Sequence, residues 1–471
     1  MVCQTSFQPI YGALSDIFGR KATLLFAIVI FELGSFLCGI SYNMISLIIC
    51  RAIAGIGGGG IIGLVIIIIS EIVSIKDRGK FQGIIHACYA IASVAGPLLG
   101  GVFTDYVNWR WCFFINLPIG AIAITIIIFL LHLPKPTGSL LDKFKRIDII
   151  GNIIIISSTV CILLSLSWGG SNYAWDSPVI IVLLCVGILG YTMFGLVENY
   201  IAVKPIAPPY LFKNFNVVSC FLLNMFMGMV KHSYVFYAPL YFQVVKAESA
   251  TQSGLDFMPY FLGLTICSII SGQLFSRTNK IQFRIVIIFA SILVVVGAGL
   301  TTMWNENSGY AELSGFMIIG GAGIGLIAPS TILCIQELVE RKNIASVTIL
   351  SLFFRAIGSV FGITISGSAF NNKLSQLIST LPSYFSTQSI YNIQLLPPDA
   401  RTLIIHVYAL AFRFTFELIL LYIDRSFYST NRLINVGILD LGIVGILGIW
   451  VLALSDLDIV KTLALSGSWV L

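Results

Sequence analysis

Long apolar runs separated by short polar connections constrain the fold of this chain more than any other feature. A helix needs about 20 apolar residues to cross the hydrocarbon core of a bilayer. Runs of that kind lie near residues 22–41, 45–70, 82–103, 112–131, 147–167, 178–198, 216–243, 254–275, 285–303, 312–335, 345–370 and 402–423. A partial run covers residues 1–15, and a further apolar stretch covers residues 433–455. We therefore predict an all-α polytopic membrane protein.

Composition excludes an ordinary soluble domain. Hydrophobic residues make up 57% of the chain and charged residues only 10%, and the mean hydropathy is +0.96. Soluble domains carry far more charge. The formal net charge of +6 does not indicate nucleic-acid binding, because basic residues in cytoplasmic loops are enough to generate it.

Basic residues gather in alternate connections, and this sets the expected orientation. Lysine and arginine are enriched in the cytoplasmic loops of membrane proteins. If Arg20 and Lys21 are cytoplasmic, the opposite side carries only Arg110, Lys246 and Lys373. The cytoplasmic set is then Arg20, Lys21, Lys76, Arg78, Lys80, Lys135, Lys143, Lys145, Arg146, Lys204, Lys213, Arg277, Lys280, Arg284, Arg341 and Lys342. This asymmetry predicts the orientation of every span.

The same orientation leaves too few residues before Gly12 for a complete span. A signal peptide is not indicated, because no basic segment and no small-residue cleavage site accompany the first apolar run. We expect that the first span and part of the second are absent from this sequence.

A polar cluster in the run QPIYGALSDIFGRKATL stands between the first two apolar segments. Asp16 and Arg20 are four residues apart, so at a helix end they share a face and pair. Gly12 and Gly19 permit a tight turn and a close approach of backbones. Such a cluster would latch two helices together. The alternative is a solvated loop in which Arg20 and Lys21 only keep the connection in the cytoplasm.

The spacing of this cluster resembles a motif of the major facilitator superfamily, G-x-L-A-D-R-x-G-R-K-x-x-L, which joins the second and third spans of those transporters. The matching residues are Gly12, Leu14, Asp16, Gly19, Arg20, Lys21 and Leu24. Two positions depart from the motif: Ser15 stands for Ala and Ile17 for Arg. The resemblance implies a conformational gate in which Glu71 pairs with Arg20. A solvated carboxylate at a helix end is the alternative for Glu71.

The apolar run RAIAGIGGGG carries an arginine and a row of glycines. Gly55, Gly57 and Gly60 do not indicate a dinucleotide fold, because that fingerprint needs a preceding strand. In lipid, small residues instead let helices approach closely. Arg51 lies within a span, where an arginine costs roughly 2.5–3.5 kcal/mol and normally faces the bundle interior. The run resembles the superfamily's fourth-span motif, which implies proton coupling by Arg51; snorkelling to the outer interface near Asn43 is the alternative.

The stretch AGPLLGG resembles the signature of the antiporting members, G-x-x-x-G-P-x-x-G-G, with Ala92 replacing its first Gly. The spacing of Gly96 and Gly100 predicts tight helix contact, and Pro97 predicts a kink. The resemblance implies an antiport motif, which consists here of Gly96, Pro97, Gly100 and Gly101.

The run NWRWCFFINLPIG follows in the next outer loop and span. It resembles the fourteen-span drug:proton antiporter branch, especially its fungal efflux pumps. The two spans near residues 147–167 and 178–198 support that branch, because a twelve-span transporter has a long cytoplasmic loop at this place. The residues of this branch signature are Trp109, Arg110, Trp111, Asn116, Pro118 and Gly120.

Three polar residues are placed inside predicted spans of the C-terminal half. Ionisable groups within a membrane are functional candidates by default. Lys231 and Arg355 are candidates for lining a cavity. His232 is a candidate for proton coupling, because histidine changes charge near neutral pH. A local hydrogen bond on its own helix is the alternative for His232.

The resemblance implies the major facilitator fold, with two six-helix bundles, two extra spans between them and the N-terminal span missing. The predicted segments are an incomplete N-terminal bundle, a basic connector, two additional spans, a second connector, a C-terminal bundle and a divergent end. Their bounds are 1–131, 132–146, 147–198, 199–215, 216–423 and 424–471.

Function follows as an expectation from this resemblance. Motifs for phosphate loops, zinc proteases and paired-cysteine zinc sites do not occur in the sequence, so we predict neither an enzyme nor a cofactor or metal site. We expect proton-coupled efflux of drug-like or secondary-metabolite molecules by a monomer, in the plasma membrane or the vacuolar membrane. The expected partners are the substrate, protons and the lipid bilayer, with no nucleic acid. An importer of solutes such as basic amino acids, and a truncated membrane protein without transport activity, are the alternatives.

Overall fold

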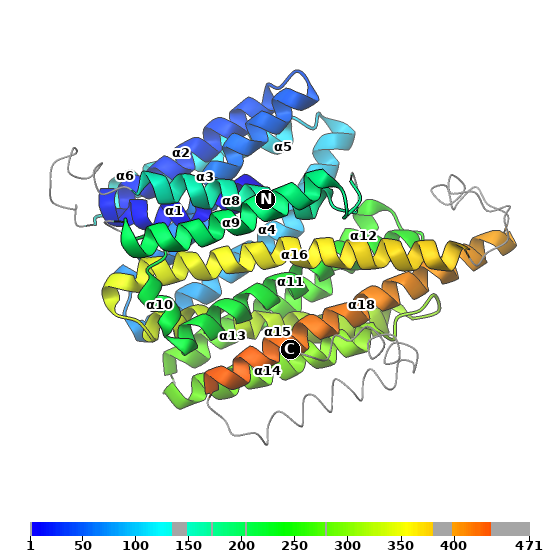
Figure 1. The fold of residues 1–471 in the computed structure, drawn as a ribbon. Coiled ribbons are helices and arrows are strands. Elements are labelled where there is room, and N and C mark those ends of the chain that lie inside the picture. Colours follow the sequence, from blue (N-terminus) through cyan, green and yellow to red (C-terminus); the bar gives the residue numbers. More distant parts are fainter. Residues whose placement is uncertain are drawn as a thin grey trace. The chain divides into compact units, whose positions relative to one another are not determined.

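The computed structural model describes residues 2–133, 148–170, 173–202, 205–277, 280–379 and 398–434 (Figure 1). Helices dominate these residues, and no strand occurs among them. The predicted all-α fold class is therefore confirmed. Most of the predicted basic connector, and nearly all of the apolar stretch at 433–455, lie outside the described residues.

The described helices coincide with the predicted spans. The first set comprises α1 (Val2–Phe18), α2 (Arg20–Gly39), α3 (Met44–Ile72), α4 (Ile75–Tyr106), α5 (Trp111–Phe114), α6 (Asn116–Leu130), α8 (Ile149–Trp168) and α9 (Pro178–Tyr200). The second set comprises α11 (Phe215–Val244), α12 (Ala250–Asp256), α13 (Met258–Arg277), α14 (Lys280–Thr301), α15 (Tyr310–Glu337), α16 (Ile344–Ser379) and α18 (Pro398–Ile434). Two short helices, α10 (Pro209–Lys213) and the 3₁₀ turn η1 (Arg341–Asn343), lie in connections. Nine helical stretches among the described residues are long and apolar enough to cross a membrane.

Side-chain caps mark where several of these helices begin. The Asn43 side chain accepts a hydrogen bond from the Ser46 amide at 2.7 Å at the start of α3. Asp148 accepts one from the Gly151 amide at 2.8 Å at the start of α8. Such caps satisfy amides that have no partner within the helix, so these polar residues determine the helix starts inside otherwise apolar sequence.

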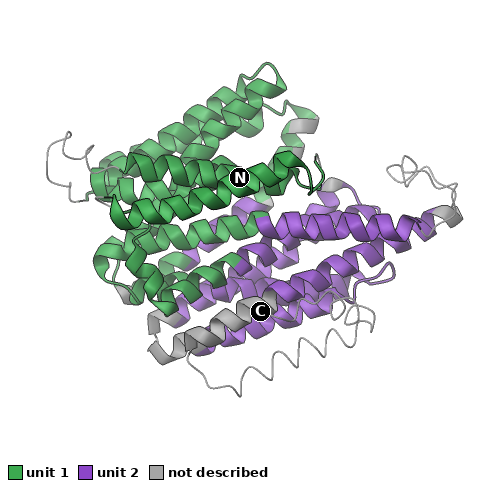
Figure 2. Cartoon of the chain, viewed as in Figure 1, with its two compact units in different colours: residues 1–82, 95–225, 331–360 green, residues 83–94, 226–330, 361–471 purple. Residues whose placement is uncertain are grey.

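The chain divides into two compact units, each described here by itself (Figure 2). Unit 1 consists of Met1–Gln82, Ala95–Met225 and Thr331–Val360. Unit 2 consists of Gly83–Val94, Phe226–Ser330 and Phe361–Leu471. Each unit therefore combines helices from both halves of the sequence. The predicted segment boundaries, which follow chain order, stay a prediction.

Glycines bring α2 and α3 of unit 1 into close contact. A Cβ atom built on Gly57 would lie 2.3 Å from the backbone nitrogen of Phe31. A Cβ atom on Gly34 would lie 2.3 Å from the backbone nitrogen of Ala54. The predicted close approach at the glycine-rich run is thus confirmed. In lipid no hydrophobic driving force acts between two apolar helices, so their association depends on close packing of this kind.

An apolar cluster in unit 1 joins α1, α2 and α3 to the beginning of α16. Tyr11, Leu64 and Ile67 are buried against Ala345 and Ile349. The Tyr11 hydroxyl donates to the Ile56 carbonyl at 2.9 Å, so its polar end is satisfied. Helices from both halves of the sequence therefore share one core at this end of the unit.

Unit 2 is held by aromatic rings and by glycines of α15. Trp304 and Phe416 are fully buried and meet edge to face, with ring centroids 5.2 Å apart. Cβ atoms on Gly321 and Gly325 would lie within 2.2 Å of backbone carbonyl oxygens of α13. Because glycine has no side chain, α13 and α15 lie closer together at these two positions than a larger residue would allow.

We predict that Gly57→Ala lowers the melting temperature of the solubilised chain by several degrees, because its methyl group meets backbone atoms of α2 that cannot turn away. Overpacking of this kind costs about 1–3 kcal/mol. Gly58→Ala is the matched control, since its Cβ would meet only the Phe31 ring at 3.6 Å, an ordinary contact. Equal melting temperatures for both variants would contradict the assignment of this helix contact.

Candidate functional site

The connection between α1 and α2 is a single residue, Gly19. Its φ of 96° lies in a region that favours glycine, and its amide donates to the Ser15 carbonyl at 3.0 Å. The predicted tight turn at Gly19 is confirmed. The predicted apolar runs at 1–15 and 22–41 leave residues 16–21 between them, and all of these except Gly19 are helical. Gly12 also lies inside α1, where a Cβ would come within 3.3 Å of Ile349.

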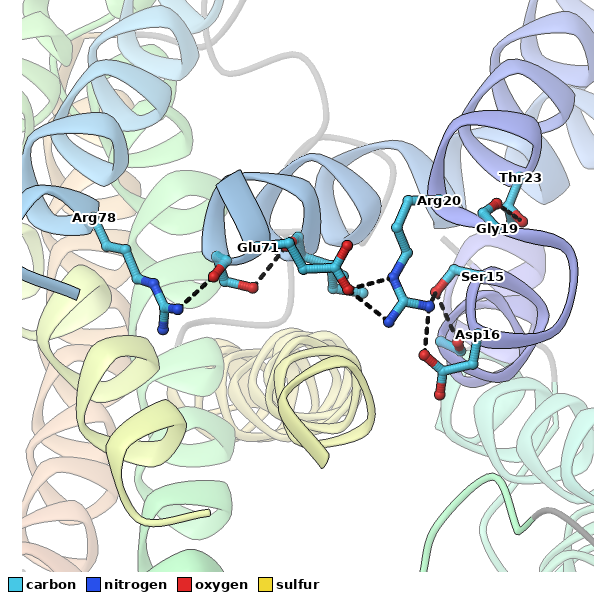
Figure 3. Close-up of polar contacts among 10 residues, drawn as sticks. Ser15, Asp16, Gly19, Arg20, Thr23, Glu71 and Arg78 are labelled. Carbon is cyan, nitrogen blue, oxygen red and sulfur yellow. Dashed lines mark hydrogen bonds and ion pairs between the residues drawn. The ribbon is translucent and has the colours of Figure 1, made fainter. Parts of the chain in front are cut away.

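Arg20 at the start of α2 is held by two carboxylates. It forms an ion pair with Asp16 on α1. Its Nε and Nη2 atoms lie 2.8 and 2.7 Å from Oε1 of Glu71 at the end of α3 (Figure 3). The Arg20 side chain is 18% exposed and that of Asp16 12%. Both predicted pairings are present. The pair with Asp16 is partly buried, whereas the Glu71 side chain is 41% exposed, so its pair with Arg20 is weakened more by solvent.

The two departures from the family motif have visible consequences. The Ser15 hydroxyl is buried, donates to the Gly12 carbonyl at 2.8 Å and accepts a hydrogen bond from Nη1 of Arg20 at 3.3 Å. Ser15 therefore adds a contact that alanine would not provide. Ile17 is 4% exposed, so an apolar side chain is buried where the motif has an arginine.

Lys21 does not join the ion-pair cluster. Its Nζ atom donates to the Ile128 carbonyl in the last turn of α6 at 2.8 Å. A cation at the carbonyl end of a helix is favourable because of the partial negative charge there. Lys21 thus links the start of α2 to the end of α6.

Arg78 binds the same end of α3 from another helix. The sequence marked it only as a basic loop residue and did not identify it as a site residue. It is 7% exposed. Its guanidinium donates to the carbonyls of Ser70 and Val73, the latter at 3.3 Å. It also donates to Oε1 of Gln336 on α15 at 3.3 Å. The Gln336 amide in turn donates to the Thr348 hydroxyl on α16 at 2.9 Å.

The electrostatics of Arg78 follow from its burial. Burial lowers the pKa of its guanidinium, the neighbouring Arg341 lowers it further, and Glu337 acts in the opposite direction. Arginine starts so far above neutral pH that it stays charged. Figure 3 shows Arg78 and Arg20 on opposite sides of Glu71, so the end of α3 is held by a cation on each side.

Arg51 lies on α3 with its side chain exposed, and its guanidinium carbon is 5.6 Å from the Phe113 ring centre. It is in a different part of α3 from the Arg20 cluster. The structure therefore does not bring Arg51 together with Asp16 or Glu71. Its predicted role in proton coupling stays a prediction.

The branch signature packs against α2. The Arg110 guanidinium lies 4.7 Å from the Trp109 ring centre and donates to the Ser41 carbonyl at 3.0 Å. The Asn116 amide donates to the Ser35 hydroxyl at 3.3 Å. Trp111 meets Phe114 edge to face at 6.0 Å.

The first two turns of α6 carry the rest of this signature. Pro118 lies in the first turn of α6, where a missing backbone donor costs little. A Cβ on Gly120 would lie 2.0 Å from Oε1 of Glu32, so the glycine makes room for a carboxyl group of α2. These residues therefore form the α2–α6 contact.

The antiport motif lies in α4. Apart from the neighbouring backbone of α4 itself, no described atom lies within 4 Å of a Cβ built on Gly96 or on Gly100. The predicted tight helix contact is therefore not found at these glycines among the described residues. Pro97 and Gly101 belong to the same helix, and the predicted role of the motif stays a prediction.

Lys231 and His232 are neighbours on α11 in unit 2, whereas Arg355 on α16 belongs to unit 1. Lys231 lies in unit 2 with its Nζ atom 4.2 Å from the Tyr89 ring centre. Nδ1 of His232 is 3.3 Å from the Gly228 carbonyl, the local contact of the alternative interpretation. Arg355 lies in unit 1, and its Nε and Nη2 donate to Oδ1 of the buried Asn224 at 3.2 and 2.8 Å. Asn224 was also missed from the sequence.

No group of three metal-ligating side chains occurs within the part of the chain that the structure describes. The site instead consists of ion pairs and hydrogen bonds at helix ends. Such an arrangement holds helices together and releases them when the charges separate, which suits a conformational change better than bond chemistry.

Comparison with known proteins supplies a family match. The model of the Major Facilitator Superfamily matches residues 1–363. The efflux pump dotC of Dothistroma septosporum is 36% identical over 381 residues, which are 81% of this chain but only 65% of that protein. The multidrug transporter protein MdtP of Bacillus subtilis is 37% identical over 80% of this chain and 68% of that protein. Among solved structures, the human organic anion transporter MFSD10 (TETRAN) has a TM-score of 0.55 at 15% identity, covering 90% of this chain and 81% of that one.

We predict that Arg78→Lys destabilises the solubilised chain by about 1–3 kcal/mol, because one ammonium nitrogen cannot reach the three acceptors that the guanidinium spans. Thermal unfolding of the full chain measures the effect. Lys80→Met is the control: its exposed pair with Asp77, at 2.9 Å, is worth little. A melting temperature of Arg78→Lys equal to that of the wild type would show that the network does not stabilise the fold.

Proposed function

Because the chain belongs to the Major Facilitator Superfamily, we propose that it is a proton-coupled secondary transporter that expels drug-like or secondary-metabolite molecules across a membrane. The family and the long apolar helices make it a multi-pass membrane protein of a transporter family. The names of similar proteins, an efflux pump and a multidrug transporter, support outward transport of small molecules. The chain spans about two thirds of the length of dotC, 65%.

The ion-pair cluster around Arg20 carries this proposal. It joins α1, α2 and α3 at the ends that the basic residues predict to be cytoplasmic. In the same unit, Arg78 donates to Gln336, whose amide donates to Thr348, and both partners belong to the other half of the sequence. Helices of both halves held together at one end fit a transporter whose cytoplasmic side is closed. Gly12, Asp16, Gly19, Arg20, Lys21 and Glu71 are thus proposed to form the gate.

The energy for export would come from a proton gradient. One proton moving inward releases roughly 2.3 kcal/mol per 100 mV and about 1.4 kcal/mol per pH unit. Their sum of about 3.7 kcal/mol would sustain a gradient of several hundred-fold for an uncharged substrate. The ion pairs and hydrogen bonds of the gate are worth about 1 kcal/mol each. The free energy released by one proton is therefore enough to break several of them.

The roles of the other candidate residues are proposed from the family resemblance and from the helix on which each residue lies. Arg51 and His232 are candidates for proton coupling, and Gly96, Pro97, Gly100 and Gly101 for the antiport motif. Lys231 and Arg355 are candidates for contact with substrate, since both are ionisable groups inside predicted spans. We further propose that the chain works as a monomer. We place its export function in the plasma membrane.

Asp16→Asn tests the gate. We expect proton-driven transport to fall at least tenfold with unchanged amounts of protein at the membrane, because the amide keeps the shape of Asp16 but removes the charge that pairs with Arg20. The loss of one partly buried ion pair, about 1.4 kcal/mol or more, corresponds to that factor. Transport would be measured as dye accumulation in inside-out vesicles energised by an imposed pH gradient.

Asp77→Asn is the matched control, because Asp77 is also acidic and lies close to a helix terminus, but both Asp77 and its partner Lys80 are exposed. We expect that variant to transport as the wild type does. Normal transport by Asp16→Asn would refute the gate. Absence of any gradient-dependent flux by the wild type, across a panel of neutral, anionic and cationic dyes, would refute the proposed function itself.

A further inference from the structure

Glu32 carries a carboxyl group inside a predicted membrane span. It is the thirteenth of the twenty residues from Arg20 to Gly39, so it lies roughly 18 Å along α2 from Arg20. The hydrocarbon core of a bilayer is about 30 Å thick, and Glu32 therefore lies well inside it. A carboxyl group at such a depth is a functional candidate by default, and its ionised form is costly there.

One carboxyl oxygen of Glu32 is buried without a partner. Its Oε2 atom has no hydrogen bond to any of the described residues. Glu198 of the same unit provides the contrast, because its two oxygens accept hydrogen bonds from the amides of Ile206 and Ala207, at 3.0 and 3.1 Å. An ionised carboxylate accepts hydrogen bonds at both oxygens, and burying one without them is costly. The absence of a donor at Oε2 therefore fits a carboxyl group that holds a proton.

A glycine makes room for this carboxyl group on α6. A Cβ atom built on Gly120 would lie 2.0 Å from Oε1 and 2.2 Å from the carboxyl carbon of Glu32. Within α6, all of which the structure describes, Gly120 is the only buried residue. The carboxyl group of Glu32 therefore lies directly against the α6 backbone, at the one place where that helix is covered.

The charged groups around α2 have other contacts. The helices packed on α2 are α1, α3, α5 and α6, and α6 has no charged residue. The titratable groups of α2 and of the other three helices, besides Glu32, are Cys3, Tyr11, Asp16, Arg20, Lys21, Cys38, Cys50, Arg51, Glu71 and Cys112, with Arg110 just before α5. No ion pair joins Glu32 to any of them in the part of the chain that the structure describes.

The four cations of this set each contact another group. Arg20 pairs with two carboxylates, Lys21 donates to the Ile128 carbonyl, and Arg110 donates to the Ser41 carbonyl. The fourth, Arg51, lies one turn from Ala54, which is opposite Gly34 of α2. It is thus roughly 8 Å along the helix axis from the level of Glu32, and its guanidinium is beside the Phe113 ring. A proton is the simplest means of removing the charge of Glu32.

We propose that Glu32 is a proton-binding residue of the transport cycle, an inference that rests on the proton-coupled transport proposed above. In the described arrangement the carboxylic acid is held between α2 and α6. When α6 moves away at Gly120, water reaches the carboxyl group, the O–H bond breaks, the proton passes to water and a carboxylate remains. Because burial of the ionised form is costly, a bound proton and a closed α2–α6 contact favour each other.

Infrared spectroscopy of the full chain in lipid nanodiscs tests for the proton directly. The carbonyl stretch of a protonated carboxyl group absorbs apart from the amide bands and from the bands of carboxylates. We expect the wild type at neutral pH to show a carboxylic-acid band that Glu32→Gln lacks. Glu312→Gln is the matched control, since Glu312 is exposed in the first turn of α15, and this variant should keep the band.

A lipid-soluble reagent, N,N′-dicyclohexylcarbodiimide, gives a second readout that needs no variant. It modifies protonated carboxyl groups in apolar surroundings. The Glu32 side chain as a whole is only half-buried, so the reagent can reach it from the lipid. We expect mass spectrometry of the labelled wild type to locate the adduct on Glu32. This measurement keeps the test decisive if Glu32→Gln does not fold.

Dye accumulation in inside-out vesicles with an imposed pH gradient measures the part that Glu32 has in coupling. We expect Glu32→Gln to accumulate at least about tenfold less dye than the wild type, because an amide cannot take up and release a proton. Downhill movement of dye without a proton gradient should persist in this variant, which distinguishes lost coupling from a damaged fold. Glu32→Asp keeps a carboxyl group and should retain part of the driven accumulation, and Glu312→Gln should transport as the wild type does.

An infrared spectrum of Glu32→Gln that keeps the acid band, an unlabelled Glu32 in the wild type, or wild-type driven accumulation by Glu32→Gln would each overturn the proposal. Failure of transport is a separate result. If the wild type shows the acid band and the adduct on Glu32 but vesicles show no gradient-driven flux of any dye, the proposed function fails and the proton-binding site stands. If vesicles transport dyes while the band and the adduct are absent, only the proton-binding site fails.

Discussion

The end of α3 is the point on which the described arrangement of unit 1 depends. Its last carbonyls carry partial negative charge and its Glu71 carries a full one. Arg20 binds the carboxylate, and Arg78 binds the carbonyls of Ser70 and Val73. Because Arg20 also binds Asp16 and Arg78 also binds Gln336, this one helix end is connected both to α1 and to α15. Moving α3 would disturb every one of these bonds.

Glycine makes these charge contacts reachable. The cations meet their partners only if the helices that carry them lie close together, and Gly57 and Gly34 let α2 and α3 approach until backbone atoms touch. Gly12 does the same for α1 where it faces Ile349 of α16. In lipid, where apolar side chains gain little from leaving their surroundings, such close packing is a main source of cohesion. Small residues and ion pairs therefore act together in unit 1.

Three cations inside the helices each contact an uncharged group. Lys231 lies over a tyrosine ring, Arg355 donates to an asparagine oxygen, and Arg51 lies near a phenylalanine ring. A ring or an amide orients a cation although it carries no net charge itself. In the cluster around Arg20, by contrast, the guanidinium is bound by two carboxylates.

The sequence by itself determined the class and the helices, and it predicted the pairing of Arg20 with Asp16. Twenty-residue apolar runs have no stable alternative to a helix in a bilayer, and residues four apart on a helix must share a face, as Asp16 and Arg20 do. It also indicated that the glycines of α3 pack closely. Only the tertiary structure decided that the polar connection shrinks to Gly19, that a Cβ on Gly96 or Gly100 would meet no described atom outside its own stretch of α4, and that Arg78 and Asn224 bind close to the candidate residues. The physical reason is range: helix formation and i,i+4 pairing depend on neighbours in the chain, whereas Arg78 and Gln336 are 258 residues apart and meet only after the helices have packed.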